Sequence, residues 1–597
     1  MTLRGAPVDA PDFPVQAGAP APCRGACPVR TDAAAYVALV AEGRLADAYD
    51  VARLHNPLAS VCGRICSAPC ERACRRGVVD TPIAIRALKR VLAESFGPEA
   101  GLASRWHRAG GTVPPATGAP IAVIGAGPAG LAAAHDLRLA GHAVTLLEAD
   151  AVPGGMMHMG IPAFRLPRAI ITAEIDAIVG LGITLRTNTR VGRDVTIEAL
   201  LDTHARVLVT IGCHGGRALP VPGGDLPGVV RAVDFLRTEN ARVAAGRDGR
   251  TLDAGPVVIV GGGSVAFDAA RSAWRGAASP HDDQAAVDAA RSAARGGSRG
   301  VTMISPETRA QLRVPPEELH EADTEGVTLL DGHGVVRLVG ETRVEGIELA
   351  PVRSLLDAQG RFAPQLDLAR ARIIPASTVV LAIGQLGDTG FLHHLEGMAR
   401  TGWGGVATDR EGRTAHPRIR VAGDIASGPR DLIDAIAHGQ RVAAALLHEL
   451  GTPPRAAPPP VPAAPPMPRA TRFWSGYDAI ARAPLPVLDT PARSATSEVE
   501  HVLDAVGAAA EGARCLRCDE QLQFATERCI ACALCIDVCP QRSLAFHDVA
   551  TGLALAFDED TCIRCGLCVH RCPTDALAFA LLPTGRRAPA AALPPIA

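Results

Sequence analysis

The sequence predicts a multidomain α/β protein whose central region is flanked by two cysteine-rich ends. Three observations predict this fold. The chain has 597 residues, two glycine-rich strand–turn–helix segments lie between residues 120 and 450, and the 17 cysteines are clustered at the spacings of metal ligands. A chain of this length usually forms about three or four domains. Apolar residues make up 48% and charged residues 20%, with a net charge of −2, which is typical of globular proteins and excludes a disordered chain.

The composition also indicates a compartment. No stretch of about 18 or more apolar residues is present, so we expect no membrane span. The first residues, MTLRGAPVDAPDFPVQ, carry Pro and Asp where a signal peptide would need an apolar core. We therefore expect a cytoplasmic protein, in which clustered cysteines indicate metal binding rather than disulfides. The basic residues are almost all Arg and form no block, so no nucleic-acid partner is expected.

The segment IAVIGAGPAGLAAAHDLRLAGHAVTLLEAD (121–150) predicts a strand, a glycine turn, a helix and a second strand that ends in an acid. Without side chains on its glycines, the turn lets a dinucleotide pyrophosphate approach the helix N-terminus. Glu148 falls where an acid accepts a hydrogen bond from a ribose hydroxyl. A Rossmann-like domain that binds no nucleotide is the less favoured alternative. The expected binding turn consists of Gly125, Gly127, Pro128, Ala129 and Gly130.

A second segment of the same kind begins at VVIVGGGSVAFDAARSA (257–273). Its pattern is Gly261-x-Gly263-x-x-Ala266, with Ser264 and Val265 opening the helix. Two dinucleotide sites in one chain favour FAD in the first and a nicotinamide nucleotide in the second. Part of this helix, FDAARSAWRG (267–276), recurs as VDAARSAARG (287–296), which we interpret as an insertion that lengthens one crossover.

Near the C-terminus, CIACALCIDVCP starts at Cys529 and CIRCGLCVHRCP starts at Cys562. Each run has the spacing C-x2-C-x2-C-x3-C-P, and two such runs are the pattern of a ferredoxin with two [4Fe–4S] clusters. Three thiolates of one run bind one cluster, and the fourth reaches the other cluster. Zinc is the less favoured alternative, because zinc sites need no duplicated triplet followed by proline. The expected ligand sets are Cys529, Cys532, Cys535 and Cys572, and Cys539, Cys562, Cys565 and Cys568.

Four further motifs appear in order: GGMMHMGIPAFRLP (154–167), TIGCHGGRALPVPG (210–223), VVLAIGQLGD (379–388) and VAGDIASGPRDLIDAIAHGQRVAAAL (421–446). Together with the two glycine turns, they resemble the glutamate synthase small-subunit family, which includes the amino-terminal half of dihydropyrimidine dehydrogenase. The resemblance covers roughly residues 20–450. It implies a cofactor-binding role for Gly155 and Arg165, and it places Gly423 and Asp424 near the ribityl and phosphate groups of the flavin.

The resemblance also implies an FAD domain that is split in sequence by an inserted NAD(P) domain. The full expectation is a helical N-terminal iron–sulfur domain, two Rossmann-like nucleotide-binding domains and a C-terminal α+β bacterial-type ferredoxin domain. The expected boundaries are 1–110 for the helical domain, 119–225 and 373–450 for the FAD domain, 226–372 for the NAD(P) domain, 451–524 for a proline-rich linker with a C-x2-C segment, 525–582 for the ferredoxin domain, and 583–597 for a disordered tail.

One departure from the family concerns the nicotinamide nucleotide. Family members that use NADPH typically carry two arginines just after the second strand of the NAD(P) unit. Here the strand VTMI is followed by Ser305, Pro306 and Glu307. An acid suits a free ribose hydroxyl pair and repels a 2′-phosphate. We therefore favour NADH over NADPH, although the neighbouring Arg309 leaves NADPH open.

The N-terminal cysteines occur in CRGACP and in CGRICSAPCERAC. The resemblance implies two [4Fe–4S] clusters here, in a domain that usually begins with C-x2-C, a short gap and C-x3-C-P. The first C-x2-C is missing. Setting aside the eight ferredoxin cysteines and Cys213, interpreted as a small buried hydrophobe, leaves eight thiols. Two of them lie in EGARCLRCD (511–519), which resembles the missing segment, and we expect it to fold back across the molecule.

By analogy with the family, one N-terminal cluster would be bound by Cys23, Cys74, Cys515 and Cys518. The other would be bound by Cys27, Cys66 and Cys70. In some relatives the fourth ligand of that cluster is a Gln or Glu. The matching position here is Lys89, which has no free lone pair at neutral pH, so Cys62 is the expected substitute. The alternative is that Cys515 and Cys518 bind a separate zinc ion or nothing.

The implied function is an NAD(P)H-dependent flavin and iron–sulfur oxidoreductase. Electrons would pass from the nicotinamide through FAD to four [4Fe–4S] clusters, and on to a ferredoxin or a partner reductase. No catalytic acid or base is expected, because hydride passes directly between cofactors. Two alternatives remain: the electron-input subunit of a glutamate synthase-type complex, and a non-enzymatic redox sensor that only binds clusters.

Overall fold

The computed structural model describes residues 20–101, 113–247, 251–252, 255–277, 300–396, 398–453, 479–549, 552–559 and 561–581. Four predicted features lie wholly or mostly outside these residues. They are the first residues of the segment 1–110, most of the proline-rich linker, the second repeat copy at 287–296 and the tail 583–597. In the described part of the chain, no helix is both long and apolar enough to cross a membrane.

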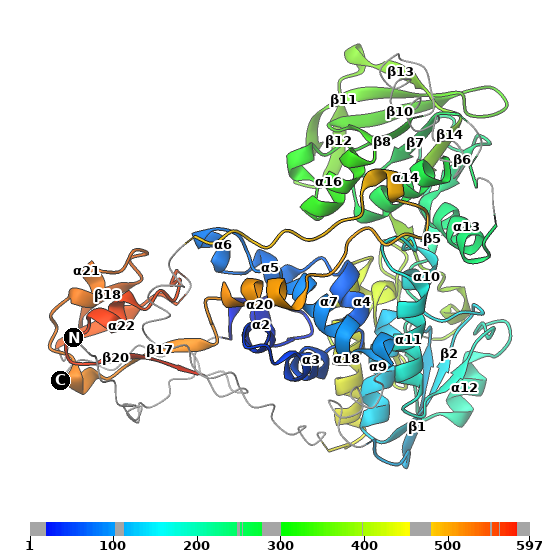
Figure 1. Cartoon of the computed structure of the whole chain (residues 1–597). Coiled ribbons are helices and arrows are strands. Elements are labelled where there is room, and N and C mark those ends of the chain that lie inside the picture. The colour runs from blue at the N-terminus through cyan, green and yellow to red at the C-terminus, as the bar shows by residue number, and fades with distance from the viewer. Residues whose placement is uncertain are drawn as a thin grey trace.

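The N-terminal unit is helical, as predicted (Figure 1). Helix α7 lies at its centre and buries Ile85, Leu88 and Leu92 against the other helices. The Tyr36 hydroxyl donates to the Ile85 carbonyl over 3.0 Å and ties α2 to the start of α7. The elements are α1 (Pro22–Ala26), α2 (Ala33–Ala41), α3 (Leu45–Leu54), α4 (Ala59–Ile65), α5 (Pro69–Arg72), α6 (Arg76–Val79), α7 (Ile85–Phe96) and η1 (Pro98–Ala100).

The first nucleotide-binding unit contains a parallel sheet in the order β16-β4-β1-β2-β3. Strand β16 comes more than two hundred positions after β4 in the chain, yet it pairs with β4 at the edge. The unit is therefore split in sequence, which confirms the predicted insertion. The strands are β1 (Gly118–Ile124), β2 (His142–Leu147), β3 (Thr184–Arg186), β4 (Arg206–Val209) and β16 (Ile419–Val421); the helices are α9 (Pro128–Leu139), α10 (Met156–Met159), α11 (Arg168–Val179), α12 (Ile197–Thr203), α17 (Asp424–Ser427) and α18 (Leu432–Glu449).

Helices α9 and α18 hold the two halves of this unit together. At their crossing, a Cβ atom at Gly439 would lie 2.1 Å from the Ala129 carbonyl oxygen. Only glycine fits at this position, because real Cβ atoms do not approach backbone so closely. The close crossing brings the returning segment directly over the first glycine turn.

The second nucleotide-binding unit has a parallel sheet in the order β6-β14-β7-β8-β9 and an antiparallel sheet of β10, β11, β12 and β13. Strand β14 was expected in the segment 373–450 of the first unit, but it pairs with β6 and β7. The chain therefore leaves this unit later than expected. The elements are β6 (Val229–Arg231), α13 (Ala232–Ala244), β7 (Val257–Val260), α14 (Ser264–Ala277), β8 (Val301–Ile304), η2 (Arg309–Gln311), α16 (Pro316–Thr324), β9 (Thr328–Leu330), β10 (His333–Val339), β11 (Gly346–Leu356), β12 (Phe362–Leu366), η3 (Leu368–Arg370), β13 (Arg372–Pro375) and β14 (Thr378–Leu381).

The two segments that connect the nucleotide-binding units lie side by side. Strands β5 (Gly215–Gly216) and β15 (Gln385–Leu386) pair antiparallel, just before η4 (Gly390–Leu392). The second unit is thus attached by a hydrogen-bonded pair of chain segments rather than by two independent loops.

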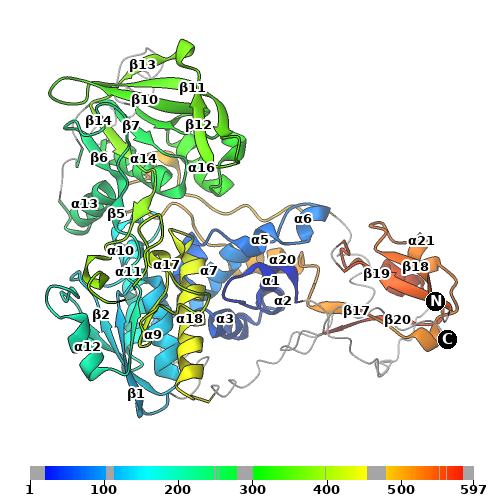
Figure 2. The same cartoon turned by 180° about the vertical axis from the view of Figure 1, so that it is seen from behind.

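Residues 479–504, here called the strap, join three units (Figures 1 and 2). The strap starts at the helical unit, where the Ile480 amide donates to Asp80 over 2.8 Å. It reaches the second nucleotide-binding unit at η5 (Thr490–Ala492), where the Ser494 carbonyl accepts from Arg275 over 2.6 Å. It then returns, and Glu500 pairs with Arg86 at 2.7 Å, before α20 (Ala505–Ala513) begins. The predicted linker is therefore a packed segment over this part.

One buried carboxylate fixes the tip of the strap. Glu325 pairs with Arg271 at 2.9 Å, with Arg275 at 2.6 Å and with Arg493 of the strap at 3.0 Å. Burial alone would raise the pKa of Glu325, but hydrogen bonds from Arg275 and Arg271, and their charges, lower it to about 2. The Arg275 guanidinium also lies 3.8 Å from the ring centroid of Phe164 in the first unit. The second nucleotide-binding unit and the strap therefore meet at the Glu325 carboxylate, and Arg275 links this contact to Phe164 of the first unit.

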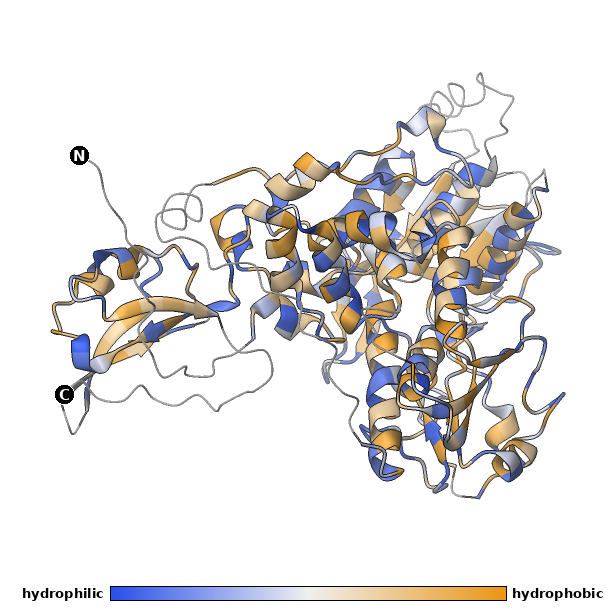
Figure 3. Cartoon of the chain, turned by 60° about the horizontal axis from the view of Figure 1, so that its bottom comes forward, coloured by the Kyte–Doolittle hydropathy of each residue, from blue (hydrophilic) through white to orange (hydrophobic). Residues whose placement is uncertain are grey.

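The C-terminal unit stands apart from the others, and its strands carry mostly hydrophobic residues (Figure 3). Strand β17 pairs with β20, and β18 pairs with β19. Because β17 starts at Glu520, this unit begins earlier than the predicted residue 525. Leu544, Leu555 and Leu577 fill its core. The elements are β17 (Glu520–Phe524), η6 (Thr526–Arg528), α21 (Leu534–Asp537), β18 (Leu544–Val549), β19 (Gly552–Phe557), α22 (Leu567–Arg571) and β20 (Leu577–Leu581).

We expect Glu325→Gln to loosen the contact between the strap and the two nucleotide-binding units. The change leaves three arginines beside a neutral amide, and removing one partner of a buried ion pair costs about 3–5 kcal/mol. Thermal unfolding and limited proteolysis should show a lower transition and earlier cleavage in the strap. Glu341→Gln, at an exposed position in the same unit, is the control. Equal behaviour of the two variants would contradict the role given to Glu325.

Candidate redox sites

The first glycine turn forms a cradle without side chains. Gly125 has φ +103°, and a Cβ there would lie 2.7 Å from the Thr210 carbonyl oxygen. A Cβ at Gly130 would lie 2.0 Å from the Gly125 carbonyl oxygen. Gly127 lies against Gly155: a Cβ at Gly155 would lie 3.0 Å from the Gly127 Cα. Helix α9 begins at Pro128, so the glycine turn lies at a helix N-terminus, where a pyrophosphate fits.

Backbone amides hold the Glu148 side chain beside this turn. Its two carboxylate oxygens accept from the Ala126 and Asp150 amides, each over 2.9 Å. Burial raises the pKa of Glu148. Each oxygen keeps a second lone pair, so the carboxylate has acceptor capacity left for ribose hydroxyls.

The returning segment meets the same turn from the other side. Gly423 has φ +77°, and a Cβ there would lie 3.0 Å from the Ala129 Cβ. The Gly423 amide donates to Nδ1 of His438 over 3.2 Å. Asp424 follows at the start of α17, and burial raises its pKa to about 6. The structure thus brings Gly423 and Asp424 to the first glycine turn.

The second glycine turn is also built for close approach. Gly261 has φ +145°, and a Cβ there would lie 2.5 Å from the Ala382 carbonyl oxygen. No atom lies within 4 Å of the Cβ position at Gly263, so the turn opens to free space just before Ser264 and Val265 start α14. The open side again lies at a helix N-terminus, which fits a second dinucleotide.

After β8, the Ser305 hydroxyl donates to Glu307 over 2.6 Å and holds this carboxylate near the strand end. Arg309 is turned to other partners, because its guanidinium pairs with Asp323 and its amide donates to Asp331. The pair of arginines that NADPH-using family members carry after this strand is therefore not found here.

Arg165, one of the residues predicted to bind a cofactor, lies where the two nucleotide-binding units meet. Its guanidinium pairs with Asp268 at 2.7 Å and also with Glu318. Both acids belong to the second nucleotide-binding unit, so Arg165 joins the two units. Sequence reasoning predicted a cofactor-binding role because Arg165 lies in the motif 154–167 with Gly155, and the motif gives no information on these distant acids.

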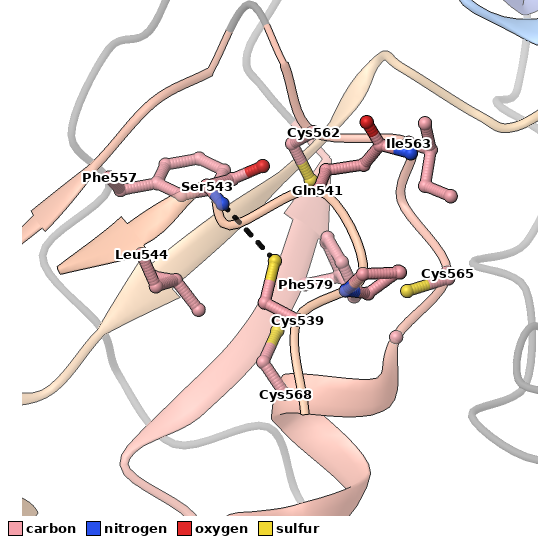
Figure 4. Close-up of a pocket in the computed structure, with 12 residues that line it drawn as sticks. Cys539, Gln541, Ser543, Leu544, Phe557, Cys562, Ile563, Cys565, Cys568 and Phe579 are labelled. Atoms are coloured by element: carbon pink, nitrogen blue, oxygen red, sulfur yellow. Dashed lines mark hydrogen bonds between the residues drawn. The ribbon is translucent and has the colours of Figure 1, made fainter. Parts of the chain in front are cut away.

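In the C-terminal unit, thiols of the two runs mix as predicted. Cys539 of the first run lies in one pocket with Cys562, Cys565 and Cys568 of the second run (Figure 4). The Ser543 amide donates to the Cys539 sulfur over 3.2 Å. Cys535 lies near Cys529 and Cys572: burial first, then the charges of these neighbours, raise the pKa of Cys535 to about 11. Each set therefore receives one thiol from the other run.

The backbone repeats in the two runs. Ala531 and Arg564 both have positive φ, as do Ala533 and Gly566, and Arg542 and Asp575. The Ala531 amide donates to the Cys529 sulfur over 3.4 Å, and the Arg564 amide donates to the Cys562 sulfur over the same distance. Such N–H···S bonds stabilise the thiolate form and tune the potential of a bound cluster.

The same turn occurs once more outside the ferredoxin unit. Arg517 has φ +51°, and its amide donates to the Cys515 sulfur over 3.4 Å. Arg30, three positions after Cys27, has φ +57° like Arg542, three positions after Cys539. Both follow a Cys-Pro pair. Two parts of one ferredoxin-type run are therefore divided between residues 515–518 and residues 23–30.

Helix α20 brings the two parts together. A Cβ at Gly512 would lie 3.0 Å from the Val37 carbonyl oxygen of α2. The Glu511 carboxylate accepts from the Ala84 amide over 2.8 Å, and Arg514 pairs with Asp80 at 2.9 Å. The segment 511–519 thus folds back onto the helical unit.

The thiols meet where this helix ends. Burial, followed by the charges of Cys515 and Cys518, raises the pKa of Cys23 well above its usual value. Cys74 likewise neighbours Cys515 and Cys518. The structure brings together the predicted set Cys23, Cys74, Cys515 and Cys518.

The other predicted N-terminal set also lies together. The Cys62 thiol is within hydrogen-bonding distance of Cys66, and it also donates to Asn56 over 3.8 Å. Lys89 is buried among the thiols of this set, which are Cys27, Cys62, Cys66 and Cys70. Four thiols are therefore available without a Gln or Glu ligand.

The chemistry of these sets, thiols alone, is that of iron–sulfur ligands. Among the described residues, no three His, Cys, Asp or Glu side chains converge as ligands of one metal ion would. In a cubane each thiolate binds a different iron atom, so its ligands stand farther apart than those of one zinc ion. Four sets of soft thiols are the ligands that [4Fe–4S] clusters prefer.

The sets at Cys515 and at Cys562 are in direct contact, which sequence reasoning did not predict. Leu516 lies between Cys515 and Cys518, Ile563 follows Cys562, and the two side chains pack together in one buried cluster. Arg75 of the helical unit donates to the Cys562 carbonyl over 3.4 Å. At the other end, Cys27 and Cys62 share a hydrophobic core with Ala126 of the first glycine turn. The sequence signal for the contact between Leu516 and Ile563 was the apolar residue that directly follows the first cysteine of each run.

Comparison with known proteins agrees with this arrangement. The family model for pyridine nucleotide-disulphide oxidoreductases matches residues 119–439, more than half of the chain. The chain belongs to this family. A model for dihydropyrimidine dehydrogenase domain II with a 4Fe-4S cluster matches residues 16–100, and a model for a 4Fe-4S dicluster domain matches residues 528–576. The chain thus carries a pyridine nucleotide-disulphide oxidoreductase region between two regions that match iron–sulfur models; the resemblance implied the first of these two, and the cysteine runs predicted the second.

Several curated proteins are similar. The NADP(+)-dependent formate dehydrogenase subunit beta of Moorella thermoacetica is 36% identical over 71% of this chain and 59% of its own length. The NAD-dependent dihydropyrimidine dehydrogenase subunit PreT of Escherichia coli K12 is 31% identical over 72% of this chain and 91% of its own length. The glutamate synthase [NADPH] small chain of Azospirillum brasilense is 30% identical over 71% and 85%. The chain spans less than two thirds of the length of the first of these relatives.

Among solved structures, Mycobacterium tuberculosis FprA in complex with NADPH is 22% identical, covers 56% of this chain and has a TM-score of 0.46. This similarity is too distant to assign a function.

We expect Cys515→Ser to remove one cluster. Anaerobically prepared protein with four [4Fe–4S] clusters holds about sixteen iron atoms per chain, and the variant should hold about twelve. Cys213→Ser, which changes the one cysteine outside the four sets, should leave iron and labile sulfide unchanged. Unchanged iron in Cys515→Ser would contradict the assignment of Cys515.

Proposed function

We propose that this chain oxidises NADH and delivers the electrons one at a time to a protein acceptor. The observation that carries the proposal is the continuous order of the sites. The first glycine turn shares a core with Cys27 and Cys62; the set of Cys23 lies beside theirs; and that set touches the ferredoxin unit through Leu516 and Ile563. A flavin at the first turn would thus stand at one end of a row of four clusters.

When bound, the flavin supplies hydride exchange with the nicotinamide and single-electron exchange with the clusters. The overall reaction balances as one NADH giving NAD+, one proton and two electrons, each of which reduces one acceptor. The residues of the chain bind and orient. Gly125, Gly127 and Gly130 admit the pyrophosphate, Glu148 accepts from the ribose, and the ion pairs of Arg165 with Asp268 and Glu318 hold the two nucleotide-binding units in one arrangement.

The preference for NADH rests on Glu307. Its carboxylate is fixed by Ser305 at the end of β8, where it suits the two ribose hydroxyls and repels a phosphate. The names of relatives do not decide this point, because one is NADP(+)-dependent and another is NAD-dependent.

A second candidate is the electron-input subunit of a larger enzyme. It is favoured by the relatives themselves, since the formate dehydrogenase, dihydropyrimidine dehydrogenase and glutamate synthase proteins are all named as subunits or chains of larger enzymes. The ferredoxin unit would then pass electrons to a tightly bound partner. Sixteen cluster-spaced cysteines favour a reducing compartment in either case, so the cytoplasm remains our expectation.

Anaerobic titration with NADH tests the proposal. The flavin absorbance of the purified protein should bleach, and the broad iron–sulfur absorbance should fall with it, because both draw on the same electrons. A protein that only binds clusters would show neither change. Persistence of the oxidised spectrum with excess NADH and with excess NADPH would overturn the proposal. Co-purification of a large subunit would favour the second candidate.

We expect the double variant Pro306→Arg and Glu307→Arg to shift the nucleotide preference toward NADPH. It supplies the missing arginine pair and removes the acid, so the ratio of kcat/KM values should change by at least about tenfold, or about 1.4 kcal/mol. Glu341→Arg, at an exposed position in the same unit, is the control. A wild-type enzyme that already prefers NADPH would contradict the role of Glu307.

A further inference from the structure

The two runs of the ferredoxin unit have the same backbone but opposite surroundings. Ile530 and Ile563 occupy equivalent positions, each directly after the first cysteine of its run. Ile563 is 5% exposed, whereas Ile530 is 64% exposed. Cys565 is buried, whereas its equivalent Cys532 is exposed. One of two equivalent faces is therefore covered and the other is free.

The covered face shows what such a face contacts. Ile563 packs on Leu516, which is 4% exposed, with Val79 and Leu567 beside them. Leu516 itself lies between the two cysteines of a C-x2-C turn with the same backbone as the ferredoxin runs. The contact is thus formed between two cluster-binding loops, each of which offers the apolar residue after its first cysteine.

The loop on the free face has the same apolar character and contains no charged residue, although exposed Glu527 and Arg528 of opposite charge precede it. Residues 529–533 read Cys-Ile-Ala-Cys-Ala. In the covered run, the position equivalent to Ala531 is Arg564, whose charge is paired with Glu559. Helix α21, which follows the free loop, lies on the side of the ferredoxin unit that faces away from the helical unit (Figures 1 and 2).

We propose that residues 529–533 dock a separate protein that presents its own [4Fe–4S] loop, with an apolar residue placed like Leu516. This inference rests on the proposed function, because it names the acceptor of the electrons that NADH supplies. Cys529, Cys532, Cys535 and Cys572 would hold the cluster that supplies one electron per encounter, and the oxidised cluster of the partner would accept it. No bond or proton changes in the transfer, and two encounters follow each NADH.

Ile530→Asp tests this docking surface, with a purified ferredoxin that holds two [4Fe–4S] clusters as the probe. A charge on the free face should weaken binding of the ferredoxin, measured by calorimetry without nucleotide, by at least about tenfold. The rate of NADH-dependent ferredoxin reduction should fall by a similar factor at low ferredoxin concentration. NADH-dependent reduction of ferricyanide, a small acceptor that needs no docking, should keep its rate.

Ile373→Asp is the matched control, because Ile373 is 53% exposed on β13 of the second nucleotide-binding unit. It should change neither binding nor rate. Ile530→Gln adds no charge and should weaken ferredoxin binding by a smaller factor. It provides the test if Ile530→Asp proves to bind less iron than the wild type. Unchanged ferredoxin binding in both Ile530 variants, or a dimer of this chain that Ile530→Asp dissociates, would overturn the inference. Failure of wild-type protein to reduce ferricyanide with NADH would instead reject the proposed function, since the binding arm does not depend on nucleotide.

Discussion

In our proposal, the arrangement of this protein depends on the need of a [4Fe–4S] cluster for four thiolates in one place. The helical unit brings Cys23 and Cys74 together but lacks the C-x2-C segment that would complete them. Helix α20 supplies it from the far end of the chain, with Gly512 against α2 and Glu511 hydrogen-bonded to the start of α7. Closing so long a loop is opposed by chain entropy, which grows only slowly with length, and the buried contacts of Glu511 and Arg514 offset it.

The return of the chain to the helical unit determines which units of the protein are neighbours. Because Cys515 and Cys518 are fixed on the helical unit, the ferredoxin unit that follows them is held with its Cys562 loop against Leu516. The strap that leads to α20 passes over the second nucleotide-binding unit and is anchored there by Arg493. A single requirement for ligands thus joins the nucleotide sites, the helical unit and the ferredoxin unit into one ordered path.

The family resemblance implied the split first unit, and local patterns in the sequence were enough to predict the two glycine turns and the exchange of one cysteine between the ferredoxin runs. They also identified EGARCLRCD, because a C-x2-C turn is a local structure. Other features depend on pairs that no motif connects. Arg493 and Glu325 are 168 positions apart, and Arg165 lies in a predicted cofactor-binding motif while pairing with acids of another unit. The positions of β14 and β17 were missed for the same reason, since short apolar strands do not indicate which sheet they join.

The most direct test of the central claim is an anomalous iron map from crystals grown without oxygen. We predict four iron-rich peaks per chain, in the order of the four thiol sets, with one peak among Cys23, Cys74, Cys515 and Cys518. The absence of iron at these four sulfurs, or a lone zinc signal at Cys515 and Cys518, would contradict the claim that the far end of the chain completes an N-terminal cluster.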